Sequence, residues 1–378
     1  MVLDTERSGP RTFKTLSHRD PEFSRYLDGS FSIEQVALPL RSLNVGTQTE
    51  EVTFEILDVA DVSAPSFLSV TRALVRPSTL ILSAGPMVAV LSRSLAIGRY
   101  VHWLLALACF VGVIAFQIAT NLLNDYGDHM KGQDRVRPQG GSRAIQRGWI
   151  RAHKVKQIAI GLTGFAALCG VPAILRSPAV IVAGIALLFT LEVAFQRLRL
   201  KARGWAEGLA FLLAGPLLTA GFVWAVTGEI ALGDLTLGCS LGMIALLYLH
   251  SANFENIMVD SQAGARTWAT RAGFDASLTF YMVVAAACLL TSLAHAYVDA
   301  AFYLVAVVAI QALFLVRPIL RVSKLTSPLS SGLHALRSWA LRLSWITAIA
   351  FCVFYLYRLF EMFLFLGFGI MLPRFDLP

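Results

Sequence analysis

Long apolar stretches decide what this 378-residue chain can fold into. We count about nine of them after residue 66, near 79–97, 101–123, 155–175, 178–196, 208–227, 234–254, 276–296, 300–316 and 342–371. At 1.5 Å per residue, each is long enough as a helix to cross roughly 30 Å of hydrocarbon. Only 15% of the residues are charged, against about 25% in soluble domains. The sequence therefore predicts an all-α polytopic membrane protein with about nine transmembrane helices.

The first 66 residues are polar, with acidic and basic residues mixed, and they precede the helical bundle that we place at 67–378. The alternation in "VTFEILDV" predicts a short strand. Because no apolar segment lies near the start, we expect no cleaved secretory signal. The pattern leaves open whether this extension is a small cytoplasmic domain or only partly ordered.

Basic residues gather in alternate loops between the apolar stretches. The four basic loops lie at 131–154, 197–203, 266–271 and 317–337. Other loops, such as "VTGEIALGD" and "HAYVDA", are acidic or nearly neutral, although "SRSLAIGR" carries two arginines. Since cytoplasmic loops are enriched in Lys and Arg, we expect the N-terminus and the basic loops in the cytoplasm and the C-terminus on the opposite side.

Charge and cysteine usage argue against other classes of protein. The net charge of +8 comes largely from these loops, and no aromatic-basic module accompanies it, so we expect no nucleic-acid partner. The five cysteines lie in separate apolar stretches, which argues against a disulfide framework and a zinc site. We interpret them as packing residues in a bundle surrounded by membrane lipid.

The stretch "NLLNDYGDHMKGQD" places acidic residues at the end of the second apolar stretch. Asn121 and Asp125 are four residues apart, as are Asn124 and Asp128, so a continuing helix puts each pair roughly on one face. Asp134 follows a few residues later. Such oxygen ligands suit Mg²⁺, which usually takes one or two carboxylates and leaves other positions to water and phosphate. A helix-end cluster that merely solvates the loop is the alternative.

A second acidic cluster ends the sixth apolar stretch, on the same predicted side of the membrane. Asn256 and Asp260 are again four residues apart, with Glu255 beside them. Two acidic helix ends on one face, each followed by a basic loop, suit a metal-bound diphosphate. The carboxylates hold the metal, and cations offset the remaining phosphate charge. The candidate cations are Lys131, Arg143, Arg266 and Arg271.

These motifs resemble those of the UbiA superfamily of intramembrane prenyltransferases, most closely its menaquinone branch, which prenylates 1,4-dihydroxy-2-naphthoate. "NDYGDHMKGQD" is similar to the first acidic motif of that branch, and "GGSRAIQRGWI" to the segment that follows it. "LKARGWAEGLAFLLAGPLLTAG" resembles the middle of the fold, "DSQAGARTWATRAG" the tail of the second motif, and "RPSTLILSAGP" the start of the first helix. The resemblance covers Arg76 to about Gly273, and residues 1–66 have no counterpart in it.

The resemblance implies a helical bundle around a cavity open to the membrane, capped by cytoplasmic loops. Mg²⁺ would be the cofactor, an isoprenyl diphosphate would ionise to an allylic cation, and an aromatic or other lipophilic acceptor would be the second substrate. The residues that correspond by position to metal or diphosphate residues are Asn124, Asp128, Asp134 and Asp260. Those that would contact the diphosphate or close the lid are Lys131, Arg143, Lys201 and Arg266.

The second motif departs from the family pattern, which is Asp-x-x-x-Asp. Here the first aspartate is replaced by Asn256, and only Asp260 is retained. Asparagine still offers a carbonyl oxygen to Mg²⁺ but brings no charge. Glu255 stands next to it, yet on a helix it would point about 100° away. Either Glu255 rebuilds the site, or the acceptor chemistry has changed.

Three functions therefore compete. The first is a Mg²⁺-dependent prenyltransferase. The second is a membrane terpene cyclase of the same superfamily, which closes the cation on its own chain without an acceptor. The third is a transporter or a lipid-binding protein without catalysis. Transporters often show helices broken at mid-membrane, whereas here the polar residues concentrate at helix ends on one face.

Further side chains lie close to the two motifs. Those that would line the cavity are Tyr126, Tyr248, His250 and Phe254. Their rings would stabilise a carbocation through cation–π contact, or simply pack. His250 would accept a proton from an aromatic substrate or make a helix-to-helix hydrogen bond. For His129 we expect a surface role, because it would face away from Asp128.

Overall fold

The chain forms two compact units. The computed structural model describes residues 12–63, 65–136, 141–176, 205–262 and 264–368. The sheet unit comprises 1–76, 118–162 and 259–265, and the bundle unit comprises 77–117, 163–258 and 266–378. The predicted division of the chain at residue 66 stays a prediction, because the unit that holds the N-terminal segment also takes in later helix ends.

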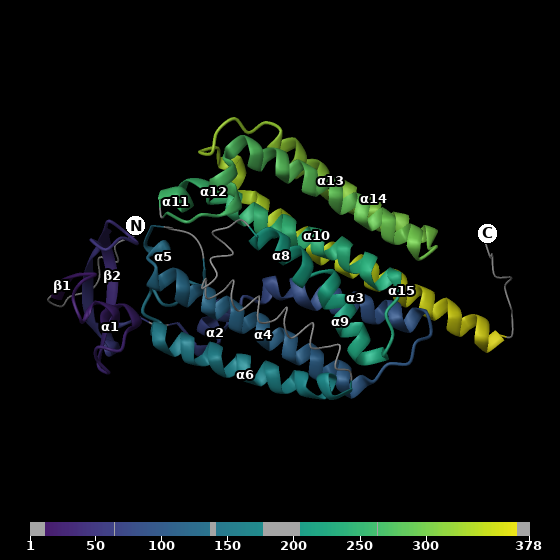
Figure 1. Ribbon diagram of the computed structural model, residues 1–378, viewed down its shortest axis with the longest axis horizontal. Coiled ribbons are helices and arrows are strands. Elements are labelled where there is room, and N and C mark those ends of the chain that lie inside the picture. The colour runs from purple at the N-terminus through teal and green to yellow at the C-terminus, as the bar shows by residue number, and fades with distance from the viewer. Residues whose placement is uncertain (1–11, 64, 137–140, 177–204, 263, 369–378) are drawn as a thin grey trace. The chain divides into compact units, whose positions relative to one another are not determined.

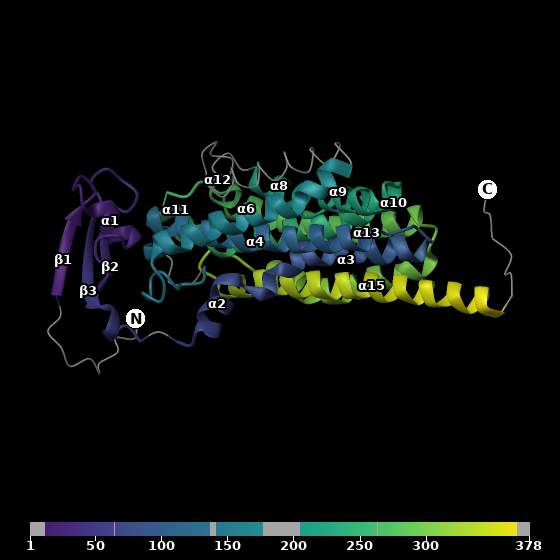
Figure 2. The ribbon, with the colours of Figure 1, turned by 90° about the horizontal axis from the view of Figure 1, so that it is seen from below.

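A small antiparallel sheet opens the sheet unit. Strands β1 (Thr12–Ser17), β2 (Gln35–Leu43) and β3 (Glu51–Asp58) pair in the order β1–β3–β2, and α1 (Phe23–Asp28) follows β1 (Figure 2). Alternate residues of β3 point inward, so that Val52 and Phe54 are fully buried. The core of the sheet and α1 consists of Leu16, Phe23, Leu27, Val52 and Phe54.

The strand predicted from "VTFEILDV" is confirmed as β3, whereas β1 and β2 have no counterpart in the sequence analysis. The reason for missing β2 is visible in its register. Its pairing with β3 shifts between Pro39 and Arg41, and proline in a strand is confined to edges and bulges. The shift interrupts the period-two alternation by which strands are recognised.

The remaining elements are helical. The sheet unit adds η1 (Val59–Asp61), α2 (Phe67–Val75), the end of α4 (Trp103–Met130), α5 (Gln133–Val136), the start of α6 (Ala152–Arg176) and most of α11 (Ile257–Gln262). The bundle unit holds η2 (Pro77–Leu80), α3 (Ile81–Ala96), α8 (Ala206–Leu213), α9 (Pro216–Thr227), α10 (Leu232–Glu255), α12 (Trp268–Ala272), α13 (Phe274–Val298), η5 (Phe302–Leu304), α14 (Val305–Val322), η6 (Ser331–Ala335) and α15 (Leu336–Phe368).

Eight helical segments of the described residues are long and apolar enough to cross a membrane. They are Phe67–Ala96, Trp103–Met130, Ala152–Arg176, Ala206–Thr227, Leu232–Glu255, Phe274–Val298, Phe302–Val322 and Ser331–Leu364. Each coincides with one of the nine predicted stretches. The ninth, 178–196, lies outside the described residues. The predicted all-α, multi-pass membrane architecture is therefore confirmed.

Helix α10 lies at the centre of the bundle unit. In its most apolar window 61% of the residues are buried, against 17–39% in the other spans. It packs against α3, α8, α9, α13 and α15, and α13 lies beside α14 (Figure 1). Two glycines of α10, four residues apart, allow this helix to lie close to the backbone at the start of α9. A Cβ on Gly238 would lie 2.6 Å from the Cα of Pro216, and one on Gly242 would lie 2.9 Å from the Cα of Gly215. Small residues at this spacing are typical of packed membrane helices.

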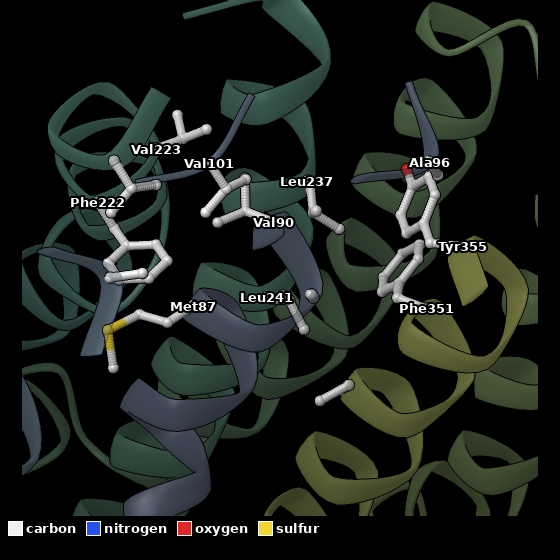
Figure 3. Packing of buried hydrophobic residues seen from close by; sticks show 14 of the residues in the cluster. Met87, Val90, Ala96, Val101, Phe222, Val223, Leu237, Leu241, Phe351 and Tyr355 are labelled. Atoms are coloured by element: carbon white, nitrogen blue, oxygen red, sulfur yellow. The ribbon is translucent and has the colours of Figure 1, made fainter. Parts of the chain in front are cut away.

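Apolar side chains from four helices interlock around α10 (Figure 3). They include Met87 and Val90 of α3, Phe222 and Val223 of α9, Leu237 and Leu241 of α10, and Phe351 and Tyr355 of α15. Lipid tails are as apolar as leucine, so this packing stabilises the bundle through close van der Waals contact rather than through removal from water. All five cysteines are free and at least half-buried, in agreement with their predicted packing role.

A buried ionic network joins α3, α10 and the end of α13, at the opposite end of α10 from the second acidic motif. Asp234 accepts from Arg93 Nη1 at 2.7 Å and from Arg99 Nη1 at 2.8 Å. Arg93 also pairs with Asp299. The two arginines come from "SRSLAIGR" and the aspartates from the two acidic loops. The two arginines that departed from the predicted loop pattern are thus neutralised by buried aspartates.

Asp299 lies just beyond the end of α13. Burial on its own raises the pKa of this carboxyl, but the hydrogen bond from Arg93 and the neighbouring positive charge bring the pKa below its ordinary value. Tyr355 donates a further hydrogen bond to Asp299 Oδ2 at 2.7 Å. The carboxylate is therefore charged at neutral pH, and its contribution to stability is lost only as the pH falls through the lowered pKa.

We expect Asp234→Asn to lower the stability of the bundle strongly. The substitution removes the buried carboxylate that Arg93 and Arg99 share, and breaking a buried ion pair costs up to about 3–5 kcal/mol. Arg93 keeps its pair with Asp299, and Arg99 keeps the exposed Glu229. The midpoint of thermal unfolding in detergent measures the effect. Asp275→Asn is the matched control, because Asp275 is exposed in the first turn of α13 and its change should stay within about 0.5 kcal/mol. Equal midpoints for the two variants would contradict the role of the network.

Candidate active site

Helix α4 carries the first acidic motif out of the apolar part of the chain. It has 28 residues and is therefore about 42 Å long, well above the roughly 30 Å of hydrocarbon. Asn121 lies 18 residues after its first residue, Trp103, at the edge of that thickness. The motif remains helical up to Met130, so the i, i+4 spacing predicted from the sequence applies to it.

Asn124 and Asp128 lie on one face of α4, as predicted. The amide Nδ2 of Asn124 donates to Asp128 Oδ2 at 3.1 Å. Asp128 is 6% exposed. Its second oxygen, Oδ1, is buried and accepts no hydrogen bond from the part of the chain that the structure describes. A carboxylate oxygen in this condition is suited to a cation, because burying an uncompensated charge is costly.

Asp125 pairs with an arginine that the sequence analysis did not select. Its carboxylate forms an ion pair with Arg76 and accepts from the backbone N–H of Ser142 at 3.3 Å. Arg76 follows α2 in the left-handed region at φ 52°. Asn121, one turn before Asp125, donates to the carbonyl of Val75 at 3.3 Å. These contacts bring the end of α2 and the 141–142 segment to the motif.

Asp134 lies on the short helix α5 and is 4% exposed. Gln146, which the sequence analysis also missed, donates through Nε2 to Asp134 Oδ2 at 2.5 Å. Arg143, a predicted diphosphate residue, donates through Nη1 to the backbone carbonyl of Asp134 at 2.7 Å. The loop after α4 therefore folds back on itself around Asp134. Lys131, another predicted diphosphate residue, is exposed on this loop.

The expected surface role of His129 is wrong. This side chain is 2% exposed, and its Nε2 lies 2.8 Å from the carbonyl oxygen of Leu27. That His129 faces away from Asp128 stays a prediction. The side chain points into the N-terminal sheet rather than to water, and no local pattern in the sequence reveals such a long-range contact.

The second motif occurs where α10 ends. Asn256 is the residue after α10, and its Nδ2 donates to the carbonyl of Ala252 at 2.7 Å. Asp260 follows on α11 and is fully buried. Residues 259–265 belong to the same compact unit as the end of α4. The sheet unit therefore contains Asp128, Asp134 and Asp260 together.

Glu255 has a partner of its own at the start of α15. Its Oε1 accepts from the backbone N–H of Arg337 at 2.7 Å, and its Oε2 lies 3.7 Å from Arg337 Nε. A carboxylate at a helix N-terminus satisfies free N–H groups and the positive end of the helix dipole. The prediction that Glu255 binds metal stays a prediction, and the observed contacts give it a role in holding α15.

A buried acidic residue near the second motif was missed. Glu207 in α8 is 3% exposed, and its Oε1 accepts from Asn253 Nδ2 at 2.7 Å. Asn253 lies about one turn before Asn256 on α10. The signal available in the sequence was a single acidic residue within an apolar helix, which is rare in membrane spans unless it is paired or functional.

The predicted cations of the later loops remain predictions. Arg266 and Arg271 are exposed in the bundle unit. Lys201 lies outside the described residues.

Of the predicted cavity-lining residues, His250 and Phe254 lie in aromatic surroundings. His250 is fully buried, and its Nε2 donates to the backbone carbonyl of Ser277 at 2.9 Å. This is the helix-to-helix hydrogen bond considered from the sequence. Its ring contacts those of Phe254, Trp268 and Phe280. Tyr248 is half-buried, and Tyr126 has Lys156 Nζ 5.5 Å from its ring centroid. That these rings line a substrate cavity stays a prediction.

The donor set fits magnesium better than zinc or iron. Within the described residues, no three His, Cys, Asp or Glu side chains gather as a ready-made metal centre. Mg²⁺ does not require one, since it keeps several waters and binds through one or two carboxylates and substrate phosphates. The buried Oδ1 of Asp128 is an oxygen ligand of the kind it uses.

Comparison with known sequences agrees with this arrangement. The model of the UbiA prenyltransferase family matches residues 85–333. A 1,4-dihydroxy-2-naphthoate octaprenyltransferase of Haemophilus influenzae is 27% identical over 201 residues. The match covers 51% of this chain and 65% of that relative, so the chain spans slightly less than two thirds of the relative's length.

Solved structures share the fold at low sequence identity. A UbiA homologue from Archaeoglobus fulgidus bound to GPP and Mg²⁺ has a TM-score of 0.55 at 12% identity and covers 77% of this chain and 99% of its own. The structure bound to DMAPP and Mg²⁺ has a TM-score of 0.54 at 13% identity, covering 76% and 98%. A structure of digeranylgeranylglyceryl phosphate synthase has a TM-score of 0.51 at 20% identity, covering 76% and 97%. Because the family model matches more than half of the chain, this chain belongs to the UbiA prenyltransferase family.

Proposed function

We propose that this chain is a magnesium-dependent intramembrane prenyltransferase, which moves an isoprenyl group from an isoprenyl diphosphate to an aromatic or other lipophilic acceptor. The observation that carries the proposal is the pair of Asn124 and Asp128 at the end of α4. Their side chains are joined at 3.1 Å, and the remaining oxygen of Asp128 is buried without a hydrogen bond from the described residues. Membership of the UbiA family supports the same function.

The residues that would hold the metal come from both acidic motifs. They are Asn124, Asp128, Asp134, Asn256 and Asp260. Asp125 and Glu255, also predicted as metal ligands, have carboxylates that pair with Arg76 and Arg337, and their binding of metal stays a prediction. Magnesium, when bound, would supply positive charge to a leaving diphosphate.

The cations would complete the charge balance of the diphosphate. Its negative charge increases at the bridging oxygen as the C–O bond breaks, and guanidinium and ammonium groups stabilise that charge best where water is excluded. Arg143 is the best placed of them, since it is held at Asp134 by a hydrogen bond of 2.7 Å to the backbone. The others are Lys131, Lys201, Arg266 and Arg271.

The transfer itself needs little covalent chemistry from the protein. A carbon of the electron-rich acceptor ring attacks the allylic carbon, the C–O bond to diphosphate breaks, and the ring then loses a proton. Aromatic side chains such as Tyr126, Tyr248 and Phe254 would shield the allylic cation from water and stabilise it through their π faces. Because cytoplasmic loops are enriched in Lys and Arg, we expect the site at the cytoplasmic face.

The names of the similar proteins suggest which substrates to try. The Haemophilus influenzae relative is named for 1,4-dihydroxy-2-naphthoate, and the Archaeoglobus fulgidus structures contain GPP and DMAPP. We therefore propose a bicyclic aromatic acceptor of the naphthoate kind. The length of the isoprenyl chain is a variable of the experiment.

We expect the purified chain in detergent to form a prenylated naphthoate from an isoprenyl diphosphate and 1,4-dihydroxy-2-naphthoate, only when Mg²⁺ is present. Diphosphates of increasing length, each with and without the acceptor, are compared by mass spectrometry of the products. A hydrocarbon or terpene alcohol formed without the acceptor would mark a terpene cyclase instead. If no diphosphate were consumed, a transporter or a lipid-binding protein would be favoured.

We expect Asp128→Asn to reduce kcat/KM by at least about 100-fold, because residues that merely support metal ligands already contribute about 10–100-fold. The substitution keeps the shape of the side chain and removes its charge. The thermal midpoint should stay equal or rise, since an uncompensated buried carboxylate is removed. Asp61→Asn, at an exposed position of the same unit, is the matched control. Loss of activity together with loss of folding would argue against a metal role for Asp128.

A further inference from the structure

The N-terminal sheet, β1 to β3 with α1, has no place in the family match, which begins at residue 85. It nevertheless belongs to the same compact unit as the end of α4 and the loop after it. Three groups of contacts join the sheet to this loop, and two of them involve buried side chains at or next to Asp134.

His129 and Gln146 connect the sheet to the carboxylate of Asp134. The carbonyl of Leu27 can only accept a hydrogen bond, so His129 Nε2, at 2.8 Å, carries the proton. The other ring nitrogen of His129 therefore accepts from Gln146 Nε2, at 3.3 Å. That same amide nitrogen donates to Asp134 Oδ2 at 2.5 Å. The backbone of α1 thus reaches Asp134 through two side chains.

Glu50 and Arg135 form a buried ion pair between the sheet and the loop. Arg135 Nη2 lies 2.5 Å from Glu50 Oε1, and both side chains are 4% exposed. The second oxygen of Glu50 accepts from the backbone N–H of Gly46 at 3.1 Å. Arg135 Nη1 donates to the carbonyl of His129 at 2.9 Å. The guanidinium next to Asp134 in the sequence is therefore held by a carboxylate of the sheet.

Apolar contacts close the same junction. Met130, the last residue of α4, packs against the core of the sheet. Gly148 adopts a positive φ of 73°, and a Cβ at this position would lie 3.0 Å from Leu38 and 3.3 Å from Val36. Both neighbours are on β2. A side chain here would be strained at this φ and would require Leu38 and Val36 to shift by a few tenths of an ångström.

We propose that the N-terminal sheet is a fixed part of the active site and that Glu50 is a positioning residue. Glu50 holds Arg135 and keeps its guanidinium off the carboxylates of the first acidic motif, while Leu27, His129 and Gln146 orient Asp134. Without Glu50, a buried guanidinium lacks its counter-charge. It would turn to Asp134, its neighbour along the chain, and compete with Mg²⁺ for the same oxygens. This inference rests on the proposed function.

The test compares Glu50→Gln with the full-length wild-type chain. We expect the Mg²⁺ concentration for half-maximal pyrophosphate release to rise by about 10–100-fold, the range found for residues that support metal ligands, with a smaller change in kcat at saturating Mg²⁺. Hydrogen–deuterium exchange without any ligand should become faster in peptides that cover 129–136 and 141–148. Glu50→Asp, which keeps the charge, should remain closer to wild type.

Two further variants separate positioning from stability. Glu22→Gln is the matched control, because Glu22 makes an exposed ion pair with Lys14 in the same segment, and we expect wild-type values. The double variant Glu50→Gln with Arg135→Gln removes both charges. It should recover most of the Mg²⁺ response, since replacing both partners of a buried pair is far less costly than removing one.

Several results would overturn the inference. Wild-type Mg²⁺ dependence in Glu50→Gln, with or without a lower thermal midpoint, would reduce the sheet to a stabilising element. A double variant as impaired as the single one would show that Arg135 does not compete for the motif. If the wild-type chain releases no pyrophosphate, the proposed function fails, and the exchange rates of the loop in the single and double variants still decide whether Glu50 positions it.

Discussion

The length of α4 determines where the first acidic motif lies. A helix of 28 residues is longer than the hydrocarbon is thick, so its last turns leave the apolar layer while still helical. Backbone groups remain satisfied within the helix, and side chains keep their i, i+4 register. Asn124 and Asp128 are therefore brought together before any loop begins. Arg76, Ser142 and Gln146 all contact the last turns of α4. The direction of these turns follows from the membrane-spanning part of the same helix.

Much of this arrangement follows from local patterns in the sequence. Apolar runs located the eight described spans, alternation located β3, and four-residue spacing placed Asn124 with Asp128. Contacts between residues that are distant in the chain could not be predicted from such patterns. Arg76 pairs with Asp125 across 49 positions, and Glu255 meets Arg337 across 82. No period or propensity encodes such pairs, which depend on how complete elements pack. The buried position of His129 was missed for the same reason.

The two ends of α10 illustrate how charge is used differently across a membrane protein. At Asp234 the carboxylate is buried and pairs with two arginines, so these charges hold helices together. At the other end, Glu255 also holds a helix, while the asparagine next to it donates to a carbonyl of its own helix. The loss of charge at Asn256 is accompanied by a buried carboxylate at Glu207, which contacts α10 one turn earlier.

The seating of Met130 in the core of the sheet fixes how α4 is rotated about its own axis. Successive residues of an α-helix advance by about 100°, so Asp128 lies about 200° and Asn124 about 240° around the helix from Met130. Measured the shorter way around the helix, Met130 is thus separated from Asp128 by about 160° and from Asn124 by about 120°. If the sheet contacted α4 one residue earlier or later, the Asn124–Asp128 pair would be rotated by about 100° relative to the sheet. The small N-terminal sheet therefore acts as an angular reference for the helix that bears the first acidic motif.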